Sequence, residues 1–255
     1  MSYRAVELPE ERLKSFFTGF RVGGFDGVNV TIPHKASVIA LLDAVDSKAK
    51  LINAVNCVNR VGNKLTGYNT DFLGFAYSLR QNGVSTEGGE FAVLGAGGSA
   101  LAVGVALAEG EVSRINVVGR SPERCEHLKE VIQQSNDSIE VVIGDESLIV
   151  ERAANIQCLV NTTPVGMSPN TRDCPLTTKT TDALFATNTA VFDLIYNPLK
   201  TILLKRAEKQ GCTAINGLQM LVAQAVYSVE IWMGGNIVTH VDMNALVRDL
   251  EKTIK

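Results

Sequence analysis

The chain has 255 residues, of which 45% are hydrophobic and 20% charged, as in an ordinary globular protein of one large or two modest domains. Its formal net charge is −3 and it has no block of lysine and arginine, which argues against a nucleic-acid or anionic-membrane binder and favours small-molecule partners. No apolar run approaches the ~20 residues of a membrane span, and five cysteines outside any CxxC or metal-ligand spacing indicate a reduced, cytoplasmic protein without a metal site.

The N-terminal third reads as an α/β region. Its patterns predict, in order, a helix within 9–20, a strand at 26–32, a helix at 36–45, and a hairpin formed by 54–60 and 64–69 around Gly62-Asn63. The segment QNGVSTEGGE at 81–90 has three glycines and no apolar periodicity. We therefore expect it to connect two domains.

From Glu90 onward, short β-rich runs alternate with helical segments, a rhythm typical of βαβ units in a parallel sheet. The predicted strands are 90–95, 114–120, 139–144, 156–162 and 190–196, the predicted helices between them 100–110, 121–134, 146–155 and 199–211, and two long helices follow at 218–235 and 241–254. We expect a substrate-binding domain of 1–80 plus 236–255 and a Rossmann-type nucleotide-binding domain of 81–235.

A glycine-rich turn links the first of these strands to its helix. The sequence Gly95-Ala96-Gly97-Gly98-Ser99-Ala100 is a GxGxxA dinucleotide fingerprint in its required strand-turn-helix setting. Gly95 permits the tight turn, Gly97 lets the backbone approach a pyrophosphate, and Ala100 lets the helix pack close to the strand. The alternative is a glycine-rich turn that binds nothing.

The end of the next strand carries Arg120, Ser121 and Arg124. An NAD site would place an acidic residue here for the ribose 2′-hydroxyl, whereas guanidinium groups match a 2′-phosphate. The sequence therefore predicts NADP. The alternative is that both arginines are solvated residues at a helix start.

Two polar loops in the N-terminal third, NVTIPHK and GYNTDFLGF, supply candidate catalytic groups. Lys35 is a candidate proton donor or stabiliser of an alkoxide, and Asp71 a candidate partner of the reacting hydroxyl; Thr31, Asn56 and Asn69 follow neighbouring element ends, where a polyol would bind. Each has a plainer alternative: Asp71 or Thr70 as a helix N-cap, and Lys35 as an exposed first-turn lysine, although a cation there opposes the helix dipole.

Eight motifs in one order resemble the shikimate dehydrogenase family, which includes quinate/shikimate dehydrogenases. They are NVTIPHK, AVNCV, GYNTD, LGAGGSA, VGRSPER, NTTPVGM, DLIYNP and NGLQMLVAQA. The resemblance implies NADPH-dependent reduction of 3-dehydroshikimate to shikimate in aromatic amino acid biosynthesis, on a two-domain α/β scaffold with the substrate in its cleft.

Individual residues follow from the resemblance. It implies that Lys35 and Asp71 are catalytic and that the substrate contacts are Thr31, Asn56, Tyr196 and Gln224. The implied cofactor contacts are Gly95, Ala96, Gly97, Gly98, Ser99, Arg120, Ser121, Arg124, Asn161, Thr162, Gly217 and Met220. Taken alone, Gln224 is equally a solvated glutamine on a helix face.

One departure from the family pattern stands out. The family begins with a strand and a serine pair that binds the substrate carboxylate, and here residues 3–8 match the second family strand. We therefore expect a truncated substrate domain and weak shikimate binding. The alternatives are a quinate/shikimate dehydrogenase of broader specificity, or an NADP-binding protein without turnover. A monomer and a homodimer are both compatible with the amphipathic C-terminal helix.

Overall fold

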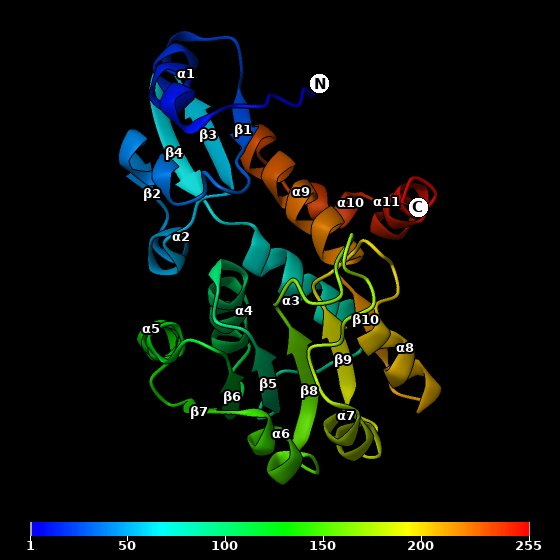
Figure 1. Cartoon of the computed structure of the whole chain (residues 1–255). Helices are drawn as coiled ribbons and strands as arrows, with labels where there is room; N and C mark the ends of the chain where they lie inside the picture. The colour runs from blue at the N-terminus through cyan, green and yellow to red at the C-terminus, as the bar shows by residue number, and fades with distance from the viewer. Residues whose placement is uncertain (1, 255) are drawn as a thin grey trace. The chain divides into compact units, whose positions relative to one another are not determined.

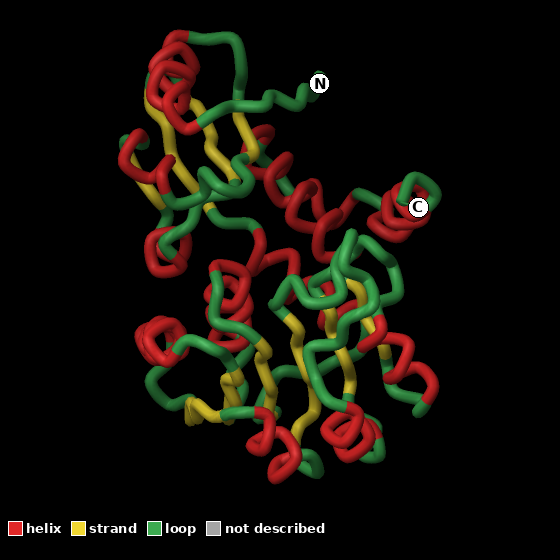
Figure 2. The backbone as a smooth tube through the Cα atoms, viewed as in Figure 1, coloured by secondary structure: helices red, strands yellow, loops and turns green. Residues whose placement is uncertain are grey.

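A computed structural model describes residues 2–254, which form two compact units (Figures 1 and 2). Unit 1 consists of the chain up to Thr70 together with Ser228–Gly235. Unit 2 consists of Asp71–Tyr227 together with the chain from Asn236 onward. No helix within residues 2–254 has both the length and the apolar character needed to cross a membrane.

Unit 1 is built on a four-stranded sheet in the order β1-β3-β4-β2. The strands β1 (Gly27–Asn29), β3 (Cys57–Val61) and β4 (Lys64–Tyr68) are antiparallel, and β2 (Ala44–Val45) runs parallel to β4. The predicted hairpin is confirmed, with Gly62 in the left-handed region of its turn at a φ of 61°. The helical elements are α1 (Glu10–Val22), the 3₁₀ helix η1 (Ser37–Leu41) and α2 (Ser47–Ile52).

The core of unit 1 lies between α1 and the sheet. Leu13, Phe17 and Phe20 recur at helical spacing on α1 and pack with Val38 and Leu65. Phe16, Phe17 and Phe20 also contact each other, and Phe25 joins them through rings 6.1 and 6.4 Å from Phe16 and Phe20. The predicted helix at 9–20 is therefore confirmed, because its apolar stripe has a sheet to cover.

The last residues of α9 complete unit 1. Trp232 donates its indole Nε1–H to the carbonyl of Val58 at 3.0 Å. Its ring lies so close to Gly27 that a Cβ there would be 2.1 Å from Nε1. Ser228 Oγ accepts a hydrogen bond from Asn29 and lies 3.2 Å from Thr70 Oγ1. A segment almost 200 positions away in sequence thus closes the β1 side of this sheet.

Two predicted elements in unit 1 are wrong. The expected helix at 36–45 is the short η1 followed by β2, because Asp43 accepts from the Leu65 backbone and from Arg21, which draws this segment onto β4. The expected strand at 3–8 is irregular: residues 2–8 pair with no strand and instead line a groove of about 1140 Å³ together with residues 24–34.

Unit 2 contains a six-stranded parallel sheet in the order β10-β9-β8-β5-β6-β7. Its strands are β5 (Glu90–Leu94), β6 (Arg114–Val118), β7 (Glu140–Gly144), β8 (Ile156–Asn161), β9 (Ala190–Asp193) and β10 (Ala214–Asn216). The five predicted strands are confirmed, and β10 was not predicted. Strand order reverses between β5 and β8, which makes the carboxyl ends of these two strands the expected ligand-binding edge.

The helices of unit 2 are α3 (Asp71–Gln81), α4 (Gly98–Glu109), α5 (Pro122–Ser135), α6 (Glu146–Arg152), α7 (Thr178–Phe185), α8 (Ile202–Lys209), α9 (Leu218–Met233), α10 (Ile237–His240) and α11 (Met243–Glu251). Helices α6, α7 and α8 cover one face of the sheet, where Val191 is buried. Next to it in β9, Phe192 points to the other face and its ring lies 4.9 Å from that of Phe75 on α3. Both faces are buried, as the near-continuous apolar strands predict.

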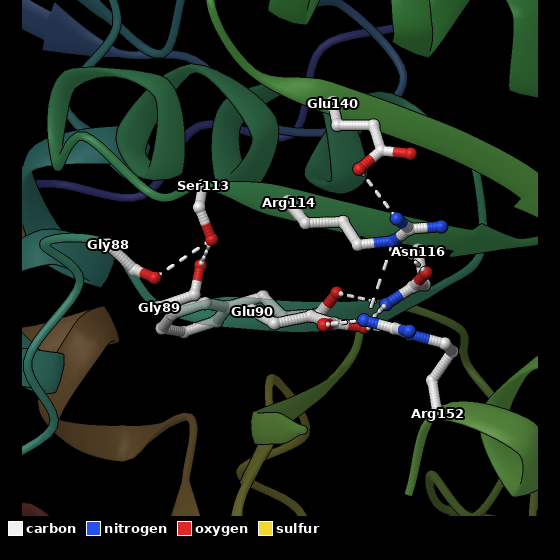
Figure 3. A network of polar contacts seen from close by, with 9 residues as sticks. Gly88, Gly89, Glu90, Ser113, Arg114, Asn116, Glu140 and Arg152 are labelled. Atoms are coloured by element: carbon white, nitrogen blue, oxygen red, sulfur yellow. Dashed lines mark hydrogen bonds and ion pairs between the residues drawn. The ribbon is translucent and has the colours of Figure 1, made fainter. Parts of the chain in front are cut away.

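At the amino ends of β5 to β7, a polar network ties three strands to α6 (Figure 3). Glu90 accepts hydrogen bonds from Arg152 and from Asn116, and Arg114 pairs with Glu140. Burial raises the pKa of Glu90, but the bonds from Arg152 and Asn116 outweigh it and leave the pKa below its usual range. This network lies at the amino ends of the strands, whereas the glycine turn lies at the carboxyl end of β5.

The compact units differ from the predicted domain bounds of 1–80 plus 236–255 and 81–235. Helix α3 packs on α4 and so belongs to unit 2, as does α11, whose Met243 packs with Val222 and Val226. The predicted connection at 81–90 also lies inside unit 2, where Gly88 donates to the carbonyl of Glu111. The chain instead passes between the units at Thr70/Asp71, Tyr227/Ser228 and Gly235/Asn236.

Candidate active site

The glycine turn at the end of β5 leaves the first turn of α4 open. Gly95 has a φ of 96°, and its N–H donates to the carbonyl of Val118. Gly97, Gly98 and Ser99 are exposed, and no side chain caps the N-terminus of α4. The first backbone N–H groups of this 12-residue helix are thus available to an anion, as the predicted pyrophosphate site requires.

The turn after β6 presents the two predicted arginines. Arg120 and Arg124 are exposed, and within residues 2–254 neither guanidinium forms an ion pair or a side-chain hydrogen bond. Ser121 is the N-cap of α5 and accepts from the Arg124 backbone at 3.4 Å. A Cβ on Gly119 would be 3.6 Å from that of Ala96, so this turn lies beside the glycine turn.

The loop after β8 packs on the glycine turn. A Cβ at Gly95 would lie 2.7 Å from Thr162 Oγ1 and 3.0 Å from Thr163 Cγ2, so only glycine fits at that contact. Thr162 is anchored in turn, because its Oγ1 donates to the carbonyl of Leu94 at 2.7 Å. Of the two predicted cofactor residues here, Thr162 is partly exposed, whereas Asn161 is fully buried.

Asn161 is held by Asp193, which the sequence analysis missed. Asp193 is fully buried at the end of β9 and accepts from Asn161 Nδ2, Ile195 N and Thr201 Oγ1 at 3.0, 3.1 and 2.7 Å. Asn161 Oδ1 then accepts from the backbone and hydroxyl of Thr163. Burial raises the pKa of Asp193 to about 6 despite its three donors. An aspartate ending an apolar strand was the available signal.

The start of α9 brings further predicted residues to the same edge of the sheet. Gly217 is buried against β9, where a Cβ would be 1.9 Å from the carbonyl oxygen of Leu194. Tyr196 follows that strand and is 42% exposed, as a substrate-facing phenol requires. Met220 and Gln224 are one turn apart on α9 and partly exposed, and Gln224 Nε2 donates to the carbonyl of Leu221.

In unit 1, Thr31 and Lys35 lie on the polar loop after β1. Thr31 is exposed and its carbonyl accepts from the His34 backbone, which forms a turn. His34 Nε2 contacts the carbonyl of Leu8 at 2.6 Å. Lys35 is partly exposed, and it precedes only the five-residue η1. The expected unfavourable cation at an α-helix N-terminus is therefore wrong, since no α-helix starts there.

Asn56 and Asn69 support the backbone that leads to Asp71. Asn56 is 2% exposed; its Oδ1 accepts from the Thr70 backbone at 2.7 Å and its Nδ2 donates to Thr70 Oγ1 at 2.9 Å. Asn69 Nδ2 donates to the carbonyl of Ala54. These bonds fix the residue before Asp71, and Asp71 itself is the partly exposed first residue of α3.

No group of three or more histidine, cysteine, aspartate or glutamate side chains within residues 2–254 has an arrangement suited to a metal ion. All five cysteines are free thiols.

The comparisons with known proteins give a consistent result. A family model described as the shikimate dehydrogenase substrate binding domain matches residues 1–58. A shikimate dehydrogenase (NADP(+)) of Symbiobacterium thermophilum is 39% identical over 91% of this chain and 79% of its own length. The relatives therefore resemble the chain across both units.

Solved structures resemble the fold equally well. A shikimate 5-dehydrogenase of Listeria monocytogenes, crystallised with shikimate and NAD, is 29% identical with a TM-score of 0.86 over 96% of this chain and 84% of its own. A ligand-free 5-ketofructose reductase of Gluconobacter is 32% identical with a TM-score of 0.84, over 97% and 86%. This fold is therefore shared by a protein named shikimate 5-dehydrogenase and by one named 5-ketofructose reductase.

Proposed function

Because the chain belongs to the shikimate dehydrogenase family, we propose that it reduces 3-dehydroshikimate to shikimate with NADPH, reversibly and without a metal ion. The observation that carries this proposal is the open N-terminus of α4 under the packed glycine turn, beside two exposed arginines. These groups fit a dinucleotide: backbone N–H groups for its pyrophosphate and guanidinium groups for a 2′-phosphate. We assign the cofactor to unit 2, and the substrate to residues of unit 1 together with Asp71, Tyr196 and Gln224 of unit 2.

The bound nicotinamide supplies a hydride to the ring carbonyl carbon. This chain's own residues do the remaining work. The ammonium of Lys35 stabilises the developing alkoxide and delivers the proton, directly or through an oriented water. The carboxylate of Asp71 accepts from the neighbouring hydroxyl and so orients the ring.

The other predicted residues bind the two ligands. We assign Thr31, Asn56, Tyr196 and Gln224 to the substrate. The cofactor residues are Gly95, Ala96, Gly97, Gly98, Ser99, Arg120, Ser121, Arg124, Asn161, Thr162, Gly217 and Met220. With five free thiols and no disulfide, we further propose a cytoplasmic enzyme of aromatic amino acid biosynthesis that works as a monomer or homodimer.

A second candidate is the reduction of another keto-polyol, which the resemblance to a 5-ketofructose reductase favours. Substrate choice among polyols depends on a few groups that meet individual hydroxyls. Turnover decides between them: NADPH absorbance should fall on addition of 3-dehydroshikimate, and much less with 3-dehydroquinate or 5-ketofructose. Faster loss with either of those would favour the second candidate, and NADPH binding without any turnover would favour a non-catalytic NADP-binding protein.

We expect Arg120→Ala and Arg124→Ala each to weaken NADPH binding by about 10–100-fold, because a hydrogen bond to a charged group contributes about 1.5–3 kcal/mol. NADH affinity should hardly change, since NADH has no 2′-phosphate. Fluorescence titration of both cofactors measures this. Lys129→Ala, which removes a cation from the same helix, is the control for net charge and should affect both cofactors little. Tighter binding of NADH than NADPH to the unaltered protein would contradict the NADP assignment.

A further inference from the structure

Helices α3 and α9 approach each other unusually closely at Gly74. Gly74 is buried on α3, and a Cβ added to it would lie 2.6 Å from the carbonyl oxygen of Met220. The same Cβ would lie 3.0 Å from both the backbone nitrogen and the Cβ of Gln224. The missing methyl group is therefore what allows the two backbones to come together.

This contact differs from that of other helical glycines in unit 2. A Cβ on Gly104 of α4 would meet Ile132 Cγ1 and Leu128 Cδ1 at 2.9 and 3.0 Å, and both are side-chain atoms rather than backbone. Those side chains have other rotamers to adopt. The atoms facing Gly74 are largely helix backbone, which moves only if a whole helix moves. The separation of α3 and α9 is thus fixed by the absence of a side chain at one position.

A second contact fixes the register of the same helix pair. One turn after Gly74, Ser78 donates from Oγ to Gln219 Oε1 at 3.0 Å, and Asn82 Nδ2 donates to the same oxygen at 2.8 Å. Gly74 and Ser78 are four residues apart and so lie on one face of α3. Two neighbouring contacts therefore prevent α3 from sliding or rolling on α9.

The residues assigned to the substrate sit next to this contact. Asp71 is the first residue of α3 and precedes Gly74 by three positions, which places it on the same face about 4.5 Å along the axis. Gln224 is itself one of the residues that Gly74 touches. We infer that Gly74 is a positioning residue for the reaction: its lack of a side chain sets the separation between Asp71 and Gln224. This inference rests on the proposed function.

The test adds one methyl group at the crossing. Alanine forms helices better than glycine, so Gly74→Ala should be harmless if the contact is loose. With a tight contact α3 must withdraw by several tenths of an ångström, and a misplacement of about 1 Å is enough to lower a rate by about 100-fold. We expect kcat/KM for shikimate oxidation to fall by about 10–100-fold in Gly74→Ala, with a higher KM for shikimate.

Gly104→Ala is the matched control, because it makes the same exchange in a helix of the same unit and should leave the KM for shikimate unchanged. Equal kinetics in Gly74→Ala and Gly104→Ala would overturn the inference. If circular dichroism shows Gly74→Ala to be unfolded, the double variant Ser78→Ala/Asn82→Ala decides, since it removes both hydrogen bonds to Gln219 Oε1 without adding an atom. A higher KM for shikimate in this double variant supports the inference, and an unchanged KM overturns it.

The unaltered protein separates this inference from the proposed function. If it turns over neither shikimate nor another polyol, the proposed function fails whatever the variants do. If it is active and the Gly74 variant is equally active, only the positioning role fails. Calorimetric binding of shikimate to the same variants provides a readout that does not depend on turnover, and it should weaken in Gly74→Ala but not in Gly104→Ala.

Discussion

Replacing Lys35 with methionine should lower kcat for 3-dehydroshikimate reduction by about 10²–10⁴-fold, the range that a positioned general acid contributes. Methionine keeps the unbranched stem and removes only the ammonium, so the loop after β1 should stay in place. NADPH affinity should remain unchanged, because the groups assigned to the nucleotide belong to unit 2. Stopped-flow measurement of the hydride-transfer step separates this loss from slow product release.

Lys50→Met is the matched control, since Lys50 is an exposed lysine on α2 of the same unit. Its kcat should equal that of the unaltered enzyme. The pH profile of kcat provides a second readout, and it should differ between Lys35→Met and the unaltered enzyme. A Lys35→Met enzyme with full activity and an unchanged pH profile would exclude the lysine from proton transfer.

The second large effect should come from Asp193→Leu, which we expect to lower the free energy of unfolding of unit 2 by about 3 kcal/mol or more. Three buried donors, on Asn161, Ile195 and Thr201, would lose their acceptor, and each stranded donor costs about 1–3 kcal/mol. NADPH affinity should fall as well, because Asn161 holds the loop that packs on the glycine turn. Urea unfolding and cofactor titration measure the two losses.

Thr201→Val is the milder comparison, since it removes one of the three donors and leaves the carboxylate with the other two. It should cost about 2 kcal/mol, because Thr201 Oγ1 also caps α8 by accepting from the Leu204 backbone, so one hydrogen bond and one N-cap are lost. If Asp193→Leu were no more destabilising than Thr201→Val, the carboxylate would not be the centre of this network.

The charge of Asp193 should also give a distinctive pH dependence. Its folded-state pKa of about 6 lies above the ordinary value, so its contribution to stability is complete below the unfolded-state pKa and is lost as the pH rises through 6. We therefore compare the unfolding free energies of the unaltered protein and Asp193→Asn between about pH 4.5 and 7.5, a range that includes the ionisation of Asp193. The difference between the two should decrease as the pH rises.

Glu90→Gln is the control with the opposite sign. The pKa of Glu90 is lowered, so its contribution is present above the unfolded-state pKa and is lost only as the pH falls through the folded-state value. Above about pH 5.5, one unit above the ordinary Glu pKa, the corresponding difference for Glu90→Gln should stay flat, and it should shrink at lower pH, where the Asp193 difference grows. Parallel curves for the two variants would contradict the assigned burial effects.

The parallel sheet of unit 2 was predictable because both of its faces are buried. Runs such as FAVLG and INVVG are rich in β-branched and apolar residues and therefore predict buried strands. The intervals between these runs predict the connecting helices. The glycine turn was equally predictable, since Gly95 and Gly97 have a fixed geometric purpose. The short β10 and α7 were not predicted, because three residues or a threonine-rich turn carry little periodic signal.

The errors have a common physical origin in contacts that are distant in sequence. Residues 36–45 have a helical pattern, but Asp43 and Asp46 bond to β4 and pull the chain into β2. Likewise, nothing local marks Gly74, whose importance depends on Met220, and the aspartate that ends an apolar strand at 193 does not by itself indicate its bond to Asn161. Motifs predicted which residues meet the ligands, whereas the residues that hold them required coordinates.

The contribution of Trp232 to unit 1 has a consequence for how the protein is made. The first seventy residues leave the ribosome long before the indole that fills the space over Gly27 and caps the carbonyl of Val58. During synthesis unit 1 is therefore incomplete, because the segment that covers β1 has not yet been made. The parallel sheet of unit 2 precedes Trp232 in the chain, so it can form earlier. Completion of unit 1 therefore waits until Trp232 has been synthesised.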